Sequence, residues 1–392
     1  MLLNALLLSS LTFIPPDTAR PPKRFSVLPF PLVYYTPETR LAYGVAVTAT
    51  FRFGALPSSG ILQKTDSLAT TPDKRPSQVT FGAAYTQNKQ LLFYIPFQIF
   101  SNENRYFFNG EVGYYKYSYY FFGLGQRDVP RELYQVNYPR IRLNAFRRIA
   151  GGTPNGPQTT FAGQLYAGVR YQYEDYRVTA TEPGGLLASG AVPGGLGSRL
   201  SGAGLGLFYD SRDQVFFPTR GIVADVSFLG QRQLLGSTVR FDRYVADVSS
   251  YHALAGPTAV LAVNYVVSLT ANGLAPFNAM SLLGSGKRLR GYYEGRFRDQ
   301  NAAILQTELR LAIWKRLGAV VFGSAGILGD SQQLLRVNDI KTAYGGGLRF
   351  TFNRRDHVNI RLDYGVGSSP VIIETGKSQS SSGIYVTIGE AF

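Results

Sequence analysis

The chain has 392 residues, a formal net charge of +15, no Cys and two His, which are His252 and His357. Without Cys the chain has no disulfides and no thiolate metal ligands. Two histidines so far apart do not build a His-rich site, so we expect neither a metal nor a cofactor. The abundance of Tyr, Phe and Gly beside two Met and one Trp is typical of an all-β protein.

The N-terminal stretch MLLNALLLSSLTFI has the apolar core of an export signal, but it has neither a basic start nor an A-x-A cleavage site. We therefore assign residues 1–20 to an export signal and residues 21–41 to an extended lead-in. A short apolar anchor or a buried segment is the alternative for the first of these. Residues 42–392 form the predicted folded domain, with no boundary to a second one.

From residue 42 onward, apolar and polar residues alternate with the period of two that marks a β-strand. In residues 358–366, for example, the apolar side chains fall on one face, and Asn359, Arg361 and Asp363 fall on the other. The segments have the length that a tilted membrane strand needs. The pattern predicts sixteen strands, at 42–53, 77–87, 91–101, 105–116, 118–125, 137–149, 160–174, 199–210, 220–230, 239–251, 258–269, 302–314, 317–327, 341–352, 357–366 and 383–392.

The connections between these strands tend to alternate between long and short. No run of 18 apolar residues exists, which excludes a transmembrane helix but leaves a membrane barrel open. We predict a sixteen-stranded antiparallel transmembrane β-barrel, with long loops at one end and tight turns at the other. A soluble β-sandwich is the alternative, although it rarely needs so many long strands. The expected long connections are 54–76, 175–198, 270–301, 328–340 and 367–382, and the short ones include 88–90, 252–257, 315–316 and 353–356.

One connection, GSGKRLRGYYEGRFRDQNA at residues 284–302, is rich in glycine and basic residues. A phosphate-binding loop needs Ser or Thr after its Gly-Lys pair, but here Arg288 follows Lys287, and a strand follows where a helix is required. One loop in which Arg and Tyr interleave is also no stacking platform for nucleic acid. We therefore expect no nucleic-acid partner, and a plain solvated basic loop remains an alternative.

Three features of the sequence together resemble the BamA/TamA family of outer-membrane barrels. Residues Leu289, Arg290, Gly291 and Tyr292 match the [VL]-R-G-[FY] tetrad of that family. The stretch from Tyr209 to Gly221 is similar to its D-x-R-D…F-P-T-x-G turn, and the C-terminal Phe392 is similar to its sorting signal. The resemblance covers residues 35–392. It implies that the tetrad lies in a long sixth extracellular loop that folds inward between strands 11 and 12, where the strand pattern also places it.

The physics of such a loop assigns roles to the tetrad. A long loop held in a water-filled lumen loses conformational entropy, so a strong contact must fix it. Arg290 suits this role because its planar guanidinium binds a carboxylate with two hydrogen bonds. Gly291 permits a tight backbone turn, and Tyr292 is expected to pack on the wall. Alternation in residues 303–313 directs Glu308 inward, so Glu308 is the expected partner of Arg290.

The family resemblance also implies an inward Phe and an inward Asp on the strand that follows. Phe322 matches the first, but Ser324 stands where the Asp is expected. Arg290 is then left with Glu308 as its charged partner and with a neutral bond from Ser324. We therefore expect a loop that is anchored more loosely.

The turn motif contains Asp210, Arg212, Asp213, Phe217, Pro218 and Gly221. Asp210 and Asp213 are expected to accept hydrogen bonds from turn amides, while Pro218 and Gly221 fix the turn geometry. A metal site built from these carboxylates is disfavoured.

The resemblance implies a bacterial outer-membrane protein that inserts or translocates other proteins, through a weak seam between its first and last strands. Its implied partners are outer-membrane lipid, unfolded outer-membrane proteins and a periplasmic or lipoprotein partner. Insertases of the family carry soluble POTRA domains before the barrel. About forty residues precede the predicted first strand, so we expect a POTRA-less member that relies on a partner for substrate capture.

Two other functions remain open at this point, a passive pore for small solutes or lipids and a surface-exposed binding barrel. We do not expect an enzyme. An outer-membrane hydrolase needs a Ser–His pair, and nothing in the sequence marks a nucleophile for His252 or for His357, which follows Asp356.

Overall fold

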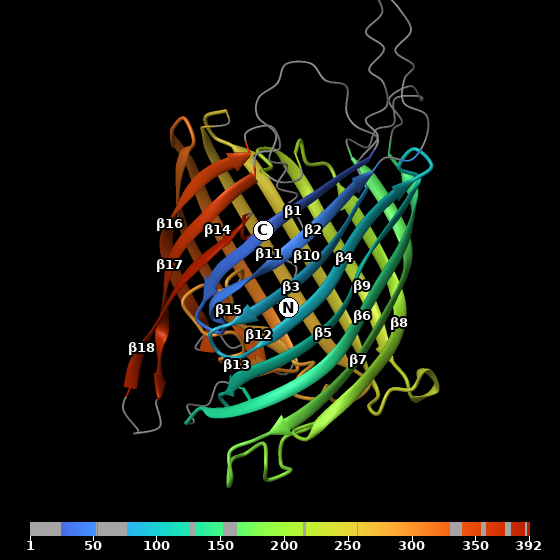
Figure 1. Ribbon diagram of the computed structural model, residues 1–392, viewed down its shortest axis with the longest axis vertical. Coiled ribbons are helices and arrows are strands. Elements are labelled where there is room, and N and C mark those ends of the chain that lie inside the picture. Colours follow the sequence, from blue (N-terminus) through green and yellow to red (C-terminus); the bar gives the residue numbers. More distant parts are fainter. Residues whose placement is uncertain are drawn as a thin grey trace, which may run out of the picture.

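The computed structural model describes residues 25–51, 53, 77–125, 130–151, 163–214, 217–256, 258–329, 339–353, 358–372, 378–388 and 390–392. Sixteen antiparallel strands close into one barrel (Figure 1), which confirms the predicted fold class. No helix among the described residues is long and apolar enough to cross a membrane. The barrel strands are β1 (Phe25–Thr36), β2 (Arg40–Phe51), β3 (Ser77–Thr86), β4 (Leu91–Ser101), β5 (Tyr106–Phe121), β6 (Glu132–Ala150), β7 (Gln164–Ala180), β8 (Gly197–Asp210), β9 (Gly221–Gln231), β10 (Phe241–Ala253), β11 (Ala259–Ala271), β14 (Asn301–Trp314), β15 (Leu317–Gly329), β16 (Lys341–Asn353), β17 (Val358–Ile372) and β18 (Ser378–Ile388).

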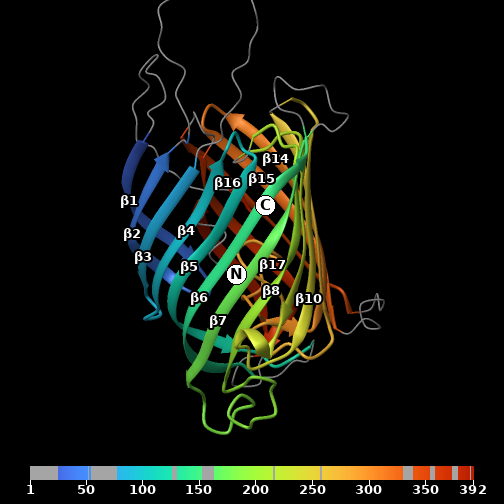
Figure 2. The same cartoon turned by 90° about the vertical axis from the view of Figure 1, so that its right-hand side faces the viewer.

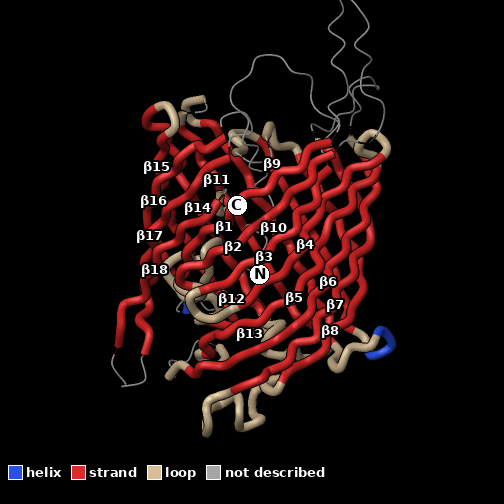
Figure 3. The backbone as a smooth tube through the Cα atoms, in the orientation of Figure 1, coloured by secondary structure: helices blue, strands red, loops and turns tan. Residues whose placement is uncertain are grey.

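Two further strands, β12 (Ser281–Leu283) and β13 (Phe297–Asp299), form a small sheet apart from the barrel. A short 3-10 turn, η2 (Gln233–Leu235), stands out in Figure 3. We call the end of the barrel at which β11 ends the loop end, and the opposite end the turn end. Figure 2 shows the connection between β7 and β8 projecting from the loop end.

The two faces of the sheet carry opposite kinds of side chain. Apolar residues such as Val33, Val321 and Leu205 are more than half exposed on the outer surface. On the inner face, charged residues such as Glu308 and Asp363 are fully buried. Because successive side chains of a strand point to opposite faces, this arrangement follows directly from the period-two pattern of the sequence.

The number of strands was predicted correctly through two errors that cancel. Residues 25–36 form β1 rather than an extended lead-in, and one strand, β5, replaces the predicted strands 105–116 and 118–125. Pro29 and Pro31 obscured β1, because proline is rare inside strands. The run of tyrosines in β5 broke the alternation, although the strand itself is continuous.

Because an extra strand comes first, three connections exchange ends. The short connection between β3 and β4 lies at the loop end, and the connection between β2 and β3 leaves from the turn end. The short connection between β4 and β5 also lies at the turn end. Residues 54–76, predicted as a long loop, lie outside the described residues. All later connections keep their predicted ends, because the second error restores the order.

The junction that closes the barrel between β1 and β18 is called the seam. Among the described residues the seam contains one registered pair, Tyr35 with Val386. By contrast, β1 pairs with β2 from one end to the other. Pro29 and Pro31 have no backbone N–H to donate, which suits β1 to a sheet edge. The seam is therefore the most sparsely paired junction among the described strands.

The face assignment predicts how a charge is tolerated at each surface. Replacing the outward Val321 by Arg places a charge in hydrocarbon, so we expect the free energy of unfolding to fall by about 2–4 kcal/mol. The matched control is Ser227→Arg on the inner face, where the charge meets water and the loss should be at most about 0.5 kcal/mol. Urea unfolding in lipid vesicles measures both. Equal losses would contradict the assignment.

Candidate functional site: the inward loop, the turn and the C-terminus

Residues 272–300, which connect β11 to β14, are called loop 6. Loop 6 contains the hairpin of β12 and β13 and folds back into the barrel, as the sequence predicted. Leu289 and Tyr292 have no exposed surface and pack with Leu283 and Phe297 against the inner wall. Burial of these apolar side chains offsets the entropy lost when a long loop is ordered.

Arg290 fixes the loop to the wall. Its Nη2 donates to Glu308 Oε1 at 2.5 Å, and its Nη1 donates to Asp363 Oδ2 at 2.5 Å. The guanidinium carbon lies 3.5 Å from the centre of the Phe322 ring, within the range of a cation–π contact. The arginine is 2 % exposed. One side chain therefore links loop 6 to β14, β15 and β17.

The two carboxylates that hold Arg290 also bind arginines of the barrel wall. Glu308 accepts a hydrogen bond from Arg310 Nε at 2.9 Å, and Asp363 accepts one from Arg349 Nη1 at 2.5 Å. All five side chains are at most 4 % exposed. Removing one partner from such a buried network leaves a charge without compensation, which typically costs about 3–5 kcal/mol.

Two expectations about this anchor need correction. The Ser324 hydroxyl donates to the carbonyl oxygen of Ala343 and makes no bond to Arg290. The second carboxylate comes instead from Asp363, two strands further along the sheet. Arg290 therefore has two charged partners, and the predicted looser anchoring is wrong. Alternation in residues 358–366 had directed Asp363 inward, but sequence alone gave no reason to pair it with a loop 73 positions away.

Glycines let the backbone of loop 6 approach β17 closely. Gly291 has a φ of +120°, and a Cβ on it would lie 2.7 Å from the backbone nitrogen of Gly367. A Cβ on Gly365 would lie 2.4 Å from the carbonyl oxygen of Arg290. Neither position accommodates a side chain without moving the backbone, so both glycines are required for the loop to reach its seat.

Loop 6 also bonds directly to the last strand. The amide of Gly291 donates to the Tyr385 hydroxyl at 3.0 Å, and the Ser381 hydroxyl donates to the Gly291 carbonyl at 2.9 Å. The Tyr292 hydroxyl donates to the carbonyl of Thr342 on β16 at 2.9 Å. The tetrad is thus connected to every strand from β14 to β18.

The C-terminal residue lies beyond the last strand. β18 ends at Ile388, so Phe392 follows the strand instead of forming part of it as predicted. Its carbonyl oxygen accepts a hydrogen bond from Arg310 Nη2 at 2.8 Å, and its ring lies 5.5 Å from the same guanidinium. Since Arg310 also binds Glu308, the C-terminus joins the network that holds Arg290.

The turn motif lies between β8 and β9 at the turn end. Arg212 Nε donates to Asp210 Oδ1 at 3.0 Å, and Asp213 Oδ1 accepts from the amides of Thr219 and Arg220 at 2.9 and 3.2 Å. Partial burial acts to raise the pKa of Asp213, but the bonds from Thr219 and its neighbours hold it below its usual range. Both aspartates therefore stabilise the turn.

The remaining members of the motif shape the same turn. Gly221 has a φ of +102°, and a Cβ there would lie 2.3 Å from the carbonyl oxygen of Ser211. Pro218 is buried and Phe217 half-buried. No group of three or more potential metal ligands exists among the described residues.

Comparison with known proteins identifies this arrangement. The Omp85 superfamily domain matches residues 71–392. The chain belongs to the Omp85 superfamily. It is accordingly a barrel of the bacterial outer membrane. No curated protein matches it.

Solved structures of Omp85-like barrels share the fold of this chain. BamA from Haemophilus ducreyi lacking POTRA domains 1–3 has 12 % identity and a TM-score of 0.54, covering 93 % of this chain and 70 % of that one. CdiB from Acinetobacter baumannii has 13 % identity and a TM-score of 0.56, and the match covers 94 % of this chain and 60 % of that one. CdiB from Escherichia coli has 10 % identity and a TM-score of 0.57, and the match covers 95 % of this chain and 64 % of that one. This chain thus spans less than two thirds of either CdiB.

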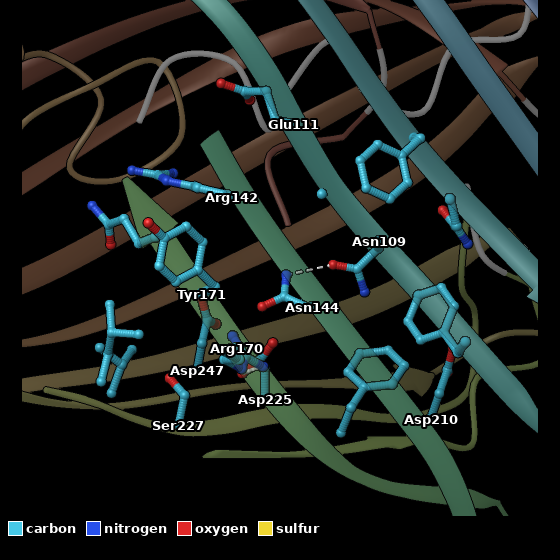
Figure 4. A pocket seen from close by; sticks show the side chains of 18 of the residues that line it. Asn109, Glu111, Arg142, Asn144, Arg170, Tyr171, Asp210, Asp225, Ser227 and Asp247 are labelled. Carbon is cyan, nitrogen blue, oxygen red and sulfur yellow. Dashed lines mark hydrogen bonds and ion pairs between the residues drawn. The ribbon is translucent and has the colours of Figure 1, made fainter. Parts of the chain in front are cut away.

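The lumen of this Omp85 barrel contains a cavity of about 550 Å³ (Figure 4). It is lined by β4 to β10 together with Arg288 of loop 6. Most of the charges on its wall are paired. The ion pairs are Arg170–Asp225, Arg212–Asp210 and Arg288–Asp247, at 2.6, 3.0 and 2.6 Å. Figure 4 also shows the 2.7 Å bond between Asn144 and Asn109.

The contact of His252 with a serine is a surface feature. His252 Nε2 lies 3.2 Å from the Ser250 hydroxyl, on an exposed stretch of β10 that does not line the cavity. His357 lies outside the described residues.

The anchor makes a direct prediction for loop 6. Changing Glu308 to Gln leaves Arg290 and Arg310 without a shared carboxylate, so we expect loop 6 to become sensitive to trypsin at its basic residues. Changing Asp363 to Asn should act in the same direction. The control is Glu103→Gln, which alters an exposed carboxylate in the turn between β4 and β5. Undiminished protease resistance in both anchor variants would refute the role of the network.

Proposed function

We propose that this Omp85 barrel inserts or translocates other outer-membrane proteins by opening its seam. The observation that supports this most strongly is that the described parts of β1 and β18 share one registered pair. In hydrocarbon, an unpaired backbone N–H or C=O costs several kcal/mol, because no water is there to satisfy it. An incoming strand that pairs with such an edge removes this cost, so a sparsely paired seam favours the addition of a client strand.

The composition of the two seam strands lowers the cost of opening. Pro29 and Pro31 reduce the number of donors that β1 offers, and Gly383 weakens β18. A second glycine near the end of this strand, Gly389, lies outside the described residues. The predicted first strand, 42–53, corresponds to β2, so the moving pair is β1 with β18.

The proposed clients are unfolded outer-membrane proteins, delivered by a periplasmic or lipoprotein partner. The residues that serve this function are the tetrad of loop 6 with Glu308 and Phe322, the turn motif and Phe392. The hydrogen bonds and ion pairs of the tetrad stabilise β14 to β18, so that β18 stays in place while β1 moves. The turn motif and Phe392 are proposed to be contact points for assembly at the turn end.

A passive pore is the second candidate, and the lumen cavity is the observation that favours it. Loop 6 argues against it, because this loop is packed into the lumen and bonded to the wall. Conductance in planar bilayers tests the pore directly. Steady ion-conducting steps from the purified barrel would favour the pore, whereas their absence is expected for an assembly barrel.

A disulfide across the seam tests the proposed function. The chain contains no Cys, so Tyr35→Cys with Val386→Cys introduces a single possible bridge, at the registered pair. We expect the locked protein to lose most of its activity, seen as reduced levels of other barrels in the outer-membrane proteome of cells that depend on it. Reduction of the bridge should restore them.

The matched control places the same bridge within a regular strand pair. Val33→Cys with Tyr43→Cys joins β1 to β2, where the register is continuous. This bridge should leave activity unchanged, because β1 and β2 are expected to move together. Full activity of the variant with the locked seam would refute the proposal.

A further inference from the structure

The turn between β1 and β2 touches loop 6 at the loop end of the barrel. Its central residue, Glu38, has no exposed surface. Glu38 Oε1 accepts a hydrogen bond from the backbone amide of Glu294 in loop 6 at 2.7 Å, across 256 positions of sequence. The backbone carbonyl of Glu38 accepts further bonds from the side chains of Asn88 and Gln90, which hold the turn in place.

Loop 6 therefore bonds to both sides of the seam. On one side it meets β18 through the bonds of Gly291 with Tyr385 and Ser381, and on the other it meets the β1–β2 turn through Glu38. The two sides also meet directly, since a Cβ on Gly383 would lie 2.9 Å from Pro37 Cγ. With one registered strand pair in the described seam, these loop contacts are a large part of what holds its loop end together.

The contact at Glu38 has an unusual feature, two buried acids with unsatisfied oxygens. Glu38 Oε2 and Glu294 Oε2 are both inaccessible to solvent and have no hydrogen-bond partner among the described residues. Buried polar atoms normally have partners, and an unpaired ionised carboxylate is among the most costly groups to bury. A bound proton removes the charge and supplies a donor, so this site favours an uncharged carboxyl group.

The electrostatic surroundings of Glu38 also favour an uncharged carboxyl group. Burial first, and the charge of Glu294 second, raise the pKa of Glu38 to about 7, although bonds from the Glu294 amide and Thr36 oppose the shift. Burial also raises the pKa of Glu294, against the effects of Arg140 and Arg298. Two phenols also face Glu38, that of Tyr385 on β18 and that of Tyr293 on loop 6, whose pKa is raised well above its usual value by burial.

We propose that loop 6 is a clamp across the seam, and that Glu38 is the positioning residue that closes its β1 side when uncharged. This inference rests on the proposed function, because that function requires the seam to open. It adds that the protonation of Glu38 controls the opening. Protonated Glu38 stays buried and keeps its bond to loop 6. Ionised Glu38 is driven toward water, so the β1–β2 turn separates from loop 6 and the seam loosens.

The direction of the pH effect follows from proton linkage. The clamped form binds the Glu38 proton more tightly than a solvated carboxyl, whose pKa is about 4.3. Clamping is therefore fully favoured below about pH 4.3 and weakens as the pH rises to about 7. Over this window the ratio of clamped to open molecules falls roughly tenfold per pH unit, and above it the ratio is constant.

Spin labels across the seam test this without any client protein. Tyr43 on β2 and Ile384 on β18 point outward on opposite sides of the seam and are 54 % and 49 % exposed. When Tyr43→Cys and Ile384→Cys carry spin labels in lipid vesicles, double electron–electron resonance measures the distance across the seam. We expect a short, narrow distribution at pH 5 and a longer, broader one at pH 9.

Variants of the acid pair decide whether Glu38 is responsible. E38Q keeps an acceptor oxygen and never ionises, so its distance should stay short at both pH values. E294Q removes the neighbouring like charge, so the transition should move to lower pH. E103Q, an exposed acid in the turn between β4 and β5, should behave like the wild type. If E38Q does not fold, the shift in E294Q carries the test alone.

Several results would overturn the clamp. They are a wild-type distance unchanged between pH 5 and pH 9, an E38Q transition at the wild-type midpoint, or an E294Q midpoint that does not fall. None of them bears on client insertion, because no client is present. Conversely, a seam that loosens with pH in a protein whose locked form remains active would support the clamp and refute the proposed function.

Discussion

A strand in a bilayer has no water to satisfy its backbone, so each N–H and C=O needs a partner within the sheet. This constraint forces the sixteen strands into a closed barrel, and it makes the seam between β1 and β18 exceptional. Elsewhere the sheet satisfies itself. At the seam the described strands share one registered pair, and the burden of holding the barrel closed moves from backbone pairing to side chains and to loop 6.

The inner network answers a second constraint, the burial of charge. Arg290, Arg310 and Arg349 occupy the same part of the wall as Glu308 and Asp363, and each arginine meets a carboxylate within 2.9 Å. Arg290 belongs to loop 6, so the two wall carboxylates, which already bind wall arginines, gain this further partner only when the loop is in place. The basic residues that suggested an external anion in the sequence are thus used largely inside the protein.

The local alternation of apolar and polar residues predicts much of the fold and of the loop 6 anchor. It does not predict contacts between distant segments. Alternation fixes which face a side chain occupies, so Glu308 was identified as an inward partner of Arg290. Alternation does not say which distant strands lie within reach, so Asp363 was missed and Ser324 was wrongly included. β1 was missed because Pro29 conflicts with strand propensity, although proline is tolerated at an edge. The contact of Glu38 with Glu294 joins two loops and leaves no local signal.

The order of synthesis gives the anchor of loop 6 a consequence for folding. Asp363, Tyr385 and Phe392 all follow the loop in the chain, and each belongs to the set of bonds that seats it. A chain that ends before β17 offers Arg290 one carboxylate and no last strand. The loop therefore cannot be seated until the final residues have arrived, so its docking reports that the whole barrel has been made.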